Sequence, residues 1–263
     1  MTDLTGADLD GARLERVSLR GSTFEQVDLS GSFLRNVDLT GVRLRGAWLE
    51  DVDIDGEVRG LRVNGVDVGP LVEAELDRRH PERRLLGLRD AQEVRDAWAA
   101  VTAAWEPLIA RARALPPALL DDQVDTEWSF LQTLRHLVFC VDAWLLRAVV
   151  LDPSPYSPLG ITHDEMGDET PVPLDHDAHP SLDEVLAVRA ERVAAMTAYV
   201  AALTDERLQE TTEPVPEPGY PASEAYPVRR CLRAVIHEDH LHRLFAERDL
   251  AVLEARAAPA PPA

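Results

Sequence analysis

The sequence predicts an α+β multidomain protein in which a short right-handed quadrilateral β-solenoid precedes an all-α four-helix bundle. Large apolar residues recur every five positions through the first 56 residues, a hairpin signal follows, and later apolar residues recur at helical spacing in long segments. We place the solenoid at 1–57, a capping hairpin and linker at 58–69, the bundle at 70–255 and a disordered tail at 256–263.

The period of five belongs to neither a helix nor a flat strand. The large residues are Leu4, Leu9, Leu14, Leu19, Phe24, Leu29, Leu34, Leu39, Leu44, Leu49 and Ile54. In a square-section solenoid, each large residue and the small residue two positions before it are expected to point inward, while glycine two positions after it suits the corner. The stretch resembles the pentapeptide-repeat family, whose pattern appears here as Ala7-Asp8-Leu9-Asp10-Gly11.

Charge does not single out the solenoid. Some pentapeptide-repeat proteins mimic DNA through acidic surfaces, but residues 1–69 hold 13 acidic and 8 basic side chains, a charge density similar to that of the remaining chain. We therefore expect a scaffold or interface role for the solenoid, with a protein partner or as a homodimer. After it, Asn64-Gly65 between alternating residues predicts a two-residue hairpin.

The composition of the whole chain argues against nucleic-acid-binding, membrane-spanning and secreted proteins. The net charge of -20 disfavours a nucleic-acid partner, and every one of the 27 basic residues is arginine. No run of 18 apolar residues predicts a membrane span, and the first ten residues lack the features of a signal peptide. We expect a soluble, cytoplasmic protein without a membrane partner, in which Cys140 and Cys231 are small core residues.

Helical spacing places the elements of the bundle. The helices are expected at about 70–79, 91–114, 128–150, 181–203 and 228–255. Ser181 and Glu184 form a capping box at the start of the fourth of them. The segment 152–180 contains six prolines and is expected to cross over without regular structure. Four long helices with one long crossover are typical of a four-helix bundle.

The sequence 236–242, IHEDHLH, carries three histidines and two carboxylates within the last helix. Residues four apart share a helix face, so Glu238 and His242 lie on a stripe with Val235 and Phe245. Polar groups on a core-facing stripe need a partner. A divalent metal is one such partner, and pairing of the two side chains with each other or with an arginine is the other.

A third ligand is available from the helix 128–150, where His136 lies in the middle of an apolar stripe. A single histidine at such a position is commonly a hydrogen-bonded core residue. Helix-bundle metal sites, however, are built from side chains of facing helices, and His136 would face Glu238 and His242 in that arrangement.

These features resemble the DinB-like superfamily of metal-binding four-helix bundles. The resemblance rests on Trp128, on His136 eight residues later, and on a polar pair in the last helix. The commoner family pattern has two histidines four apart in that helix, whereas Glu238 stands four before His242 here. This departure is similar to the branch of mycothiol-dependent maleylpyruvate isomerase, which implies the metal ligands His136, Glu238 and His242.

The resemblance also implies a cofactor and a reaction. It implies a divalent metal, zinc or nickel, with an open coordination position that lowers the pKa of a bound thiol. The partners are then a low-molecular-weight thiol such as mycothiol and a small electrophile, in an S-transferase or isomerase reaction. The alternatives are a non-catalytic, metal-stabilised bundle whose solenoid is a protein-interaction module, and a hydrolase that uses metal-bound water.

Other polar residues are weaker candidates. His237 and His240 are expected at the solvent-exposed surface beside the stripe of Glu238. Arg229 and Arg230 are either contacts for an anionic substrate or ordinary surface charges. His163, His176 and His179 lie in the crossover loop and are expected to have no function.

Overall fold

The computed structural model describes residues 4–56, 58–163, 166, 172–175 and 177–257. The chain divides into two compact units, Met1–Glu57 and Val58–Ala263. Among the described residues, no helix has the length and apolar character needed to cross a membrane.

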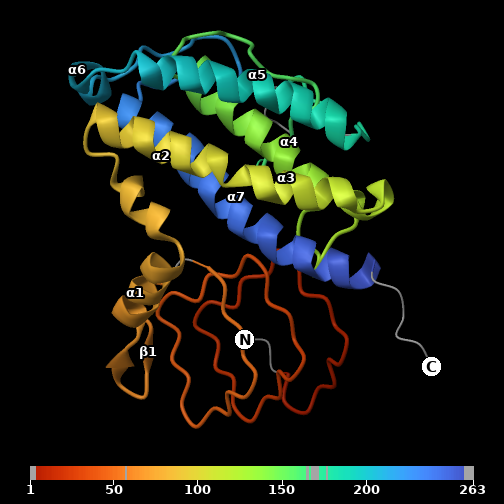
Figure 1. Cartoon of the computed structure of the whole chain (residues 1–263). Coiled ribbons are helices and arrows are strands. Elements are labelled where there is room, and N and C mark those ends of the chain that lie inside the picture. The colour runs from red at the N-terminus through yellow and green to blue at the C-terminus, as the bar shows by residue number, and fades with distance from the viewer. Residues whose placement is uncertain (1–3, 57, 164–165, 167–171, 176, 258–263) are drawn as a thin grey trace. The chain divides into compact units, whose positions relative to one another are not determined.

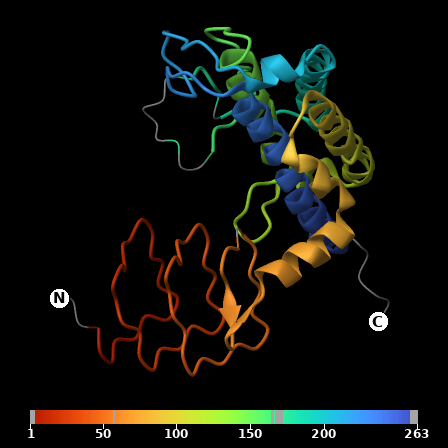
Figure 2. The same cartoon turned by 90° about the vertical axis from the view of Figure 1, so that its left-hand side faces the viewer.

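The backbone of the first unit winds in successive coils (Figures 1 and 2), and its turns and bends recur every five residues. Turns are closed by hydrogen bonds such as those from the Ala7 and Ala12 amides to the Leu4 and Leu9 carbonyls, at 3.0 and 2.9 Å. The residue two after each large apolar residue has a positive φ. These residues are Gly6, Gly11, Arg16, Gly21, Gln26, Gly31, Asn36, Gly41, Gly46, Asp51 and Gly56. Glycine, which adopts positive φ without strain, therefore occupies seven of these eleven positions.

The predicted inward burial of the large residues is wrong for the structure as described. Their side chains are 47 % exposed at the least, for Leu19, and 69 % at the most, for Leu44. Within 4–56 no residue belongs to a β-strand, so no ladder of hydrogen bonds draws neighbouring coils together around these side chains. The repeat is present in the backbone, but it does not enclose an apolar interior.

The second unit begins with the predicted hairpin. Strands β1 (Arg62–Val63) and β2 (Val66–Asp67) pair antiparallel, with Arg62 opposite Asp67. Asn64 and Gly65 both have positive φ, of 49° and 84°, as a type I′ turn requires. Helix α1 (Gly69–Arg79) follows with Pro70 in its first turn, and a 3-10 segment, η1, covers Pro81–Gly87.

The helix predicted at 91–114 is two helices, α2 (Ala91–Ala103) and α3 (Trp105–Ala114), joined at Ala104. Pro107 explains the break, because its nitrogen has no hydrogen to donate to the carbonyl of residue 103. A short 3-10 segment, η2 (Pro117–Asp121), then leads to the next long helix.

That helix and its successors follow the predicted pattern with local differences. Helix α4 covers Phe130–Val141 and continues into a π-helical segment, η3 (Asp142–Arg147). The described residues of 152–180 contain no helix or strand, as predicted. Helix α5 (Leu182–Ala201) starts at the predicted capping box, and the last helix, α7, covers Val228–Ala257. The short helix α6 (Asp205–Gln209) was not predicted.

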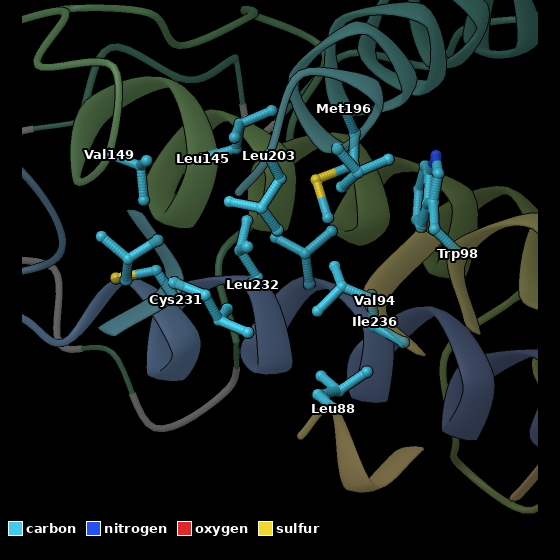
Figure 3. Packing of buried hydrophobic residues seen from close by; sticks show 14 of the residues in the cluster. Leu88, Val94, Trp98, Leu145, Val149, Met196, Leu203, Cys231, Leu232 and Ile236 are labelled. Carbon is cyan, nitrogen blue, oxygen red and sulfur yellow. The ribbon is translucent and has the colours of Figure 1, made fainter. Parts of the chain in front are cut away.

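The core lies where α4 packs against α5 and against α7 (Figure 1). Figure 3 shows Leu232 and Ile236 of α7 directed toward Met196 of α5, Leu145 of η3 and Trp98 of α2. Eleven of the 12 residues of α4 are buried, all except Gln132. A polar side chain of α4 therefore needs a partner inside the protein.

Candidate metal centre

His136 of α4 and the pair Glu238 and His242 of α7 meet in the second unit. One potential ligand atom from each lies within 4.8 Å of those from the other two. The Glu238 Oε2 atom is 3.6 Å from His136 Nε2 and 3.2 Å from His242 Nε2. The one-turn spacing of Glu238 and His242 and the packing of α4 on α7 produce this arrangement.

The orientation of His136 is set from the crossover loop. Its Nδ1 atom lies 3.1 Å from the Ile161 carbonyl oxygen, which only accepts hydrogen bonds, so Nδ1 carries the proton. The lone pair is then on Nε2, the nitrogen that faces Glu238. Histidine ligands of metals are commonly held by such a bond from the other ring nitrogen.

A buried arginine holds the loop that supplies this carbonyl. Arg135, next to His136 in α4, donates hydrogen bonds of 2.7–2.8 Å to the carbonyls of Leu159, Asp175 and Ala178. The crossover lacks regular structure, yet three backbone groups on it are tied to α4. These contacts keep Ile161 beside the imidazole.

Trp128 covers the two imidazoles. Its ring centroid lies 4.6 Å from that of His136 and 5.6 Å from that of His242, and the second pair is stacked with an interplanar angle of 15°. Trp128 directly precedes Ser129, whose side chain and that of Gln132 form a capping box at the start of α4. The cap thus places the indole over the site.

Burial and hydrogen bonding favour the ligand forms of His136 and Glu238. Burial lowers the pKa of His136, which keeps the ring neutral, although the neighbouring Glu238 carboxylate opposes this shift. Burial alone would raise the pKa of Glu238, but its contacts with the imidazoles of His136 and His242 hold that pKa well below its usual range. The site therefore offers a carboxylate and a neutral imidazole.

The three residues fit a divalent metal. With bonds of about 2.0–2.2 Å and angles of about 90–110°, two ligand atoms lie about 3.0–3.5 Å apart, close to the two distances at Glu238. The ligand atoms of the whole cluster lie within 4.8 Å of one another, so the two imidazoles would draw together around a bound ion. Glu238 is the most open of the three, with 40 % of its side chain exposed against 5 % for His136 and 15 % for His242. A metal held there would face solvent on the Glu238 side, as an open coordination position requires.

Both cysteines are buried and free, as predicted. The Cys140 Sγ atom lies one turn along α4, 3.2 Å from His136 Nε2. Burial raises the pKa of Cys140 well above its usual value, and burial raises that of Cys231 to about 11. Both thiols therefore stay protonated, and neither resembles a nucleophile.

The prediction that His237 and His240 are solvent-exposed is wrong. His240 is 1 % exposed, and His237 is partly buried with Nε2 3.3 Å from the Leu86 carbonyl oxygen. The reason is that α7 packs against α2, α3, α4, α6 and η1, so that most of its circumference is covered. The predicted exposure was based on one apolar stripe of the helix and did not take account of the elements packed on its other faces.

Asp239, beside Glu238, was missed by the sequence analysis. Its carboxylate accepts hydrogen bonds from the Trp105 indole at 2.6 Å and from the Arg189 guanidinium at 2.8 and 3.2 Å. All three side chains are buried, so α7 is joined to α3 and α5 by charged hydrogen bonds next to the candidate ligands. An isolated acidic residue in a helix gives no signal of such a distant partner.

The remaining candidates are not ligands of this cluster. The Arg229 guanidinium donates to the Arg89 carbonyl at 2.9 Å, whereas Arg230 lies over two aromatic rings. The ring of His163 contacts Tyr220 with centroids 5.6 Å apart, and His179 is exposed in the loop. The prediction for His176 lies outside the described residues.

In the second unit, two facing helices present two imidazoles and a carboxylate. This arrangement places the unit in the class of helical bundles with a candidate metal centre. The DinB superfamily model matches residues 100–246, which include His136, Glu238 and His242, and the chain belongs to that superfamily. The pentapeptide-repeat model matches eight copies over 2–36 and 18–56. No curated protein and no solved structure matches the chain.

Proposed function

We propose that His136, Glu238 and His242 bind one divalent metal ion, zinc or nickel, and that the protein is a transferase for a low-molecular-weight thiol such as mycothiol. The observation that carries this proposal is the approach of three suitable ligand atoms, with the lone pair of His136 Nε2 oriented by Ile161. Membership of the DinB superfamily adds support.

The ligand set suits thiol activation. When bound, the metal would lower the pKa of a coordinated thiol, so that a thiolate is available at neutral pH. Two neutral imidazoles and one carboxylate leave a net charge of about +1 to attract that thiolate. The thiol proton would leave to solvent on the exposed Glu238 side. The sulfur would then form a bond to the electrophilic carbon, and the leaving group would depart with the electrons of its own bond.

Turnover tests this proposal. The purified protein, supplied with zinc or nickel, is incubated with mycothiol and monobromobimane, and the rate is compared with that of His136→Ala. We expect this variant to lose most of the rate above the uncatalysed reaction. His179→Ala, which removes an exposed loop histidine, should keep the full rate.

Two outcomes decide against the transferase. Equal rates for wild type and His136→Ala would leave a bundle whose metal has no catalytic role. Consumption of an ester or amide without any thiol would favour the hydrolase, in which metal-bound water is the nucleophile.

For the first unit we propose a right-handed quadrilateral solenoid that acts as a protein-interaction module, with a protein partner or a second copy of the chain. Support comes from the five-residue period of positive φ values and from apolar side chains left exposed, including Phe33 at 61 % and Trp48 at 94 %. Exposed apolar surface of this extent is typical of interaction sites. Sedimentation velocity of wild type and Trp48→Ser tests self-association, and a monomeric wild type would exclude the homodimer.

A further inference from the structure

Helix α7 carries a strip of residues that extends away from the candidate metal centre. Arg230, Ala234, Glu238 and His242 follow one another at intervals of four, so they lie on one helix face. Each of them is exposed or partly exposed. With a rise of about 1.5 Å per residue, Arg230 lies about 12 Å along the helix from Glu238. Between them on this face lies only the methyl group of Ala234.

Arg230 is held by aromatic rings. Its guanidinium carbon lies 5.7 Å from the ring centroid of Trp144 and 5.3 Å from that of Tyr226. In the parts of the chain that the structure describes, no carboxylate forms an ion pair with Arg230. Ring contacts fix the plane of a guanidinium but leave its N–H donors for a ligand.

Aromatic residues connect the two ends of the strip. The Tyr220 ring contacts those of Trp144 and Phe139, with centroids 5.8 and 5.7 Å apart, and Phe139 contacts His136 at 6.3 Å. Burial raises the pKa of Tyr220, and the charges of both Glu238 and Arg230 act on its phenol. Tyr220 therefore lies within electrostatic range of both ends.

The backbone at Trp144 is itself unusual. Trp144 belongs to the π-helical segment η3, and single π turns of this kind are rare and concentrate at functional sites. Here the π turn carries the indole that contacts Tyr220, Tyr226 and Arg230. Its wider turn follows α4, the helix that supplies His136.

We infer that Arg230 binds the carboxylate of a planar, aromatic electrophile whose reactive carbon lies at the Glu238 end of the strip. The inference rests on the proposed function, because the metal-bound thiol is what the electrophile meets there. The chain carries a net charge of -20, which repels anions at long range, so an anionic substrate requires a local, oriented cation. The planar fork of an arginine matches a carboxylate with two parallel hydrogen bonds.

Binding of unreactive ligands tests the inference without turnover. Isothermal titration calorimetry of the full-length protein compares 4-methylbenzoate with its uncharged isostere 4-methylbenzamide. We expect Arg230→Gln to weaken 4-methylbenzoate binding by about tenfold or more and to leave the amide unchanged. Arg230→Lys keeps the charge but not the planar fork, so its affinity for 4-methylbenzoate should lie between those of the wild type and Arg230→Gln.

Arg233→Gln is the matched control. It removes the same charge from the same helix at an exposed position one turn along, off the strip. We expect it to change the affinity for either ligand by less than about twofold, because exposed charges at such distances are screened by salt. Equal losses in Arg230→Gln and Arg233→Gln, or a wild type that binds the amide as tightly as the acid, would overturn the inference.

Reaction with 4-(bromomethyl)benzoate separates this inference from the proposed function. The thiolate sulfur forms a bond to the benzylic carbon, and bromide leaves with the electrons of the carbon–bromine bond. Arg230→Gln should raise KM for this substrate, but not for 4-(bromomethyl)benzamide. His136→Ala should abolish turnover of both while still binding 4-methylbenzoate. Loss of that binding in His136→Ala as well would count against a separate anion subsite.

Discussion

At the scale of single residues, burial and hydrogen bonding select the same protonation states that a metal would require. Burial lowers the pKa of His136, and its hydrogen bond to Ile161 leaves the Nε2 lone pair facing Glu238 and the Cys140 thiol. Contacts with the two imidazoles lower the pKa of Glu238 and keep it ionised, although burial opposes this. The protonation states of the site therefore suit a cation before any ion binds, so the site is preorganised.

These shifts predict how the stability of the metal-free protein depends on pH. The folded pKa of His136 lies below the unfolded value of about 6.5, so the unfolded state binds more protons and stability falls as the pH drops below that value. The depressed pKa of Glu238 acts in the same direction, with its contribution present above about pH 4.3 and lost at lower pH.

Urea unfolding at about pH 5 and about pH 7.5 measures this dependence. We expect the wild type to be less stable at the lower pH and His136→Gln to show a smaller difference between the two. His179→Gln, at the exposed loop, should behave as wild type. An unchanged pH dependence in His136→Gln would contradict the assignment of a neutral, buried imidazole.

Thiol labelling gives a second residue-scale prediction. Cys140 and Cys231 are both buried, and burial raises the pKa of each. We expect neither to react with a disulfide reagent in the folded protein at about pH 8, and both to react in denaturant. Rapid labelling of Cys140 in the native protein would show that the region beside His136 opens, or that the protein supplies its own nucleophile.

At the scale of elements, the spacing of Glu238 and His242 on one helix was readable from the sequence because the helical period alone sets it. The break at Ala104 was missed: Pro107 is a signal for it, but the apolar pattern continues across it and favoured one helix. The π turn of η3 and the burial of His240 depend on which helices surround α4 and α7, and local patterns do not contain that information.

The buried pair of Asp239 and Arg189 joins α7 to α5 beside the candidate ligands. Asp239→Asn would leave the guanidinium without its counter-charge inside the protein, and we expect a loss of about 3–5 kcal/mol of unfolding free energy. Glu191→Gln removes the 73 % exposed partner of Arg192, which keeps its pair with Asp142, and should cost less than about 1 kcal/mol. If Asp239→Asn were as stable as the wild type in chemical denaturation, the buried pair would contribute nothing to the joining of these helices.

At the scale of the whole molecule, the chain consists of two units with different sources of order. The second unit has a packed core and charged hydrogen bonds between helices, whereas the described part of the first has a repeating backbone and half-exposed apolar residues. The period of five predicted the turns, because they depend on local residues. The burial predicted from the same period was wrong, because burial depends on hydrogen bonds between coils about 20 residues apart.

This division predicts that the two units respond independently to substitution. Trp48→Ser removes a side chain that is 94 % exposed, so we expect no change in the metal content of the protein or in the thermal unfolding of the helical unit. Calorimetry with elemental analysis measures both. A lower metal content in this variant would mean that the repeat unit supports the site directly.

The central claim is that one ion is held jointly by α4 and α7, and anomalous diffraction from a crystal grown with zinc or nickel tests it most directly. We expect one peak per chain, about 2.0–2.2 Å from His136 Nε2, from a Glu238 oxygen and from His242, with at least one coordination position open to solvent. Absence of a peak at these three side chains, or a peak with other ligands, would contradict the account.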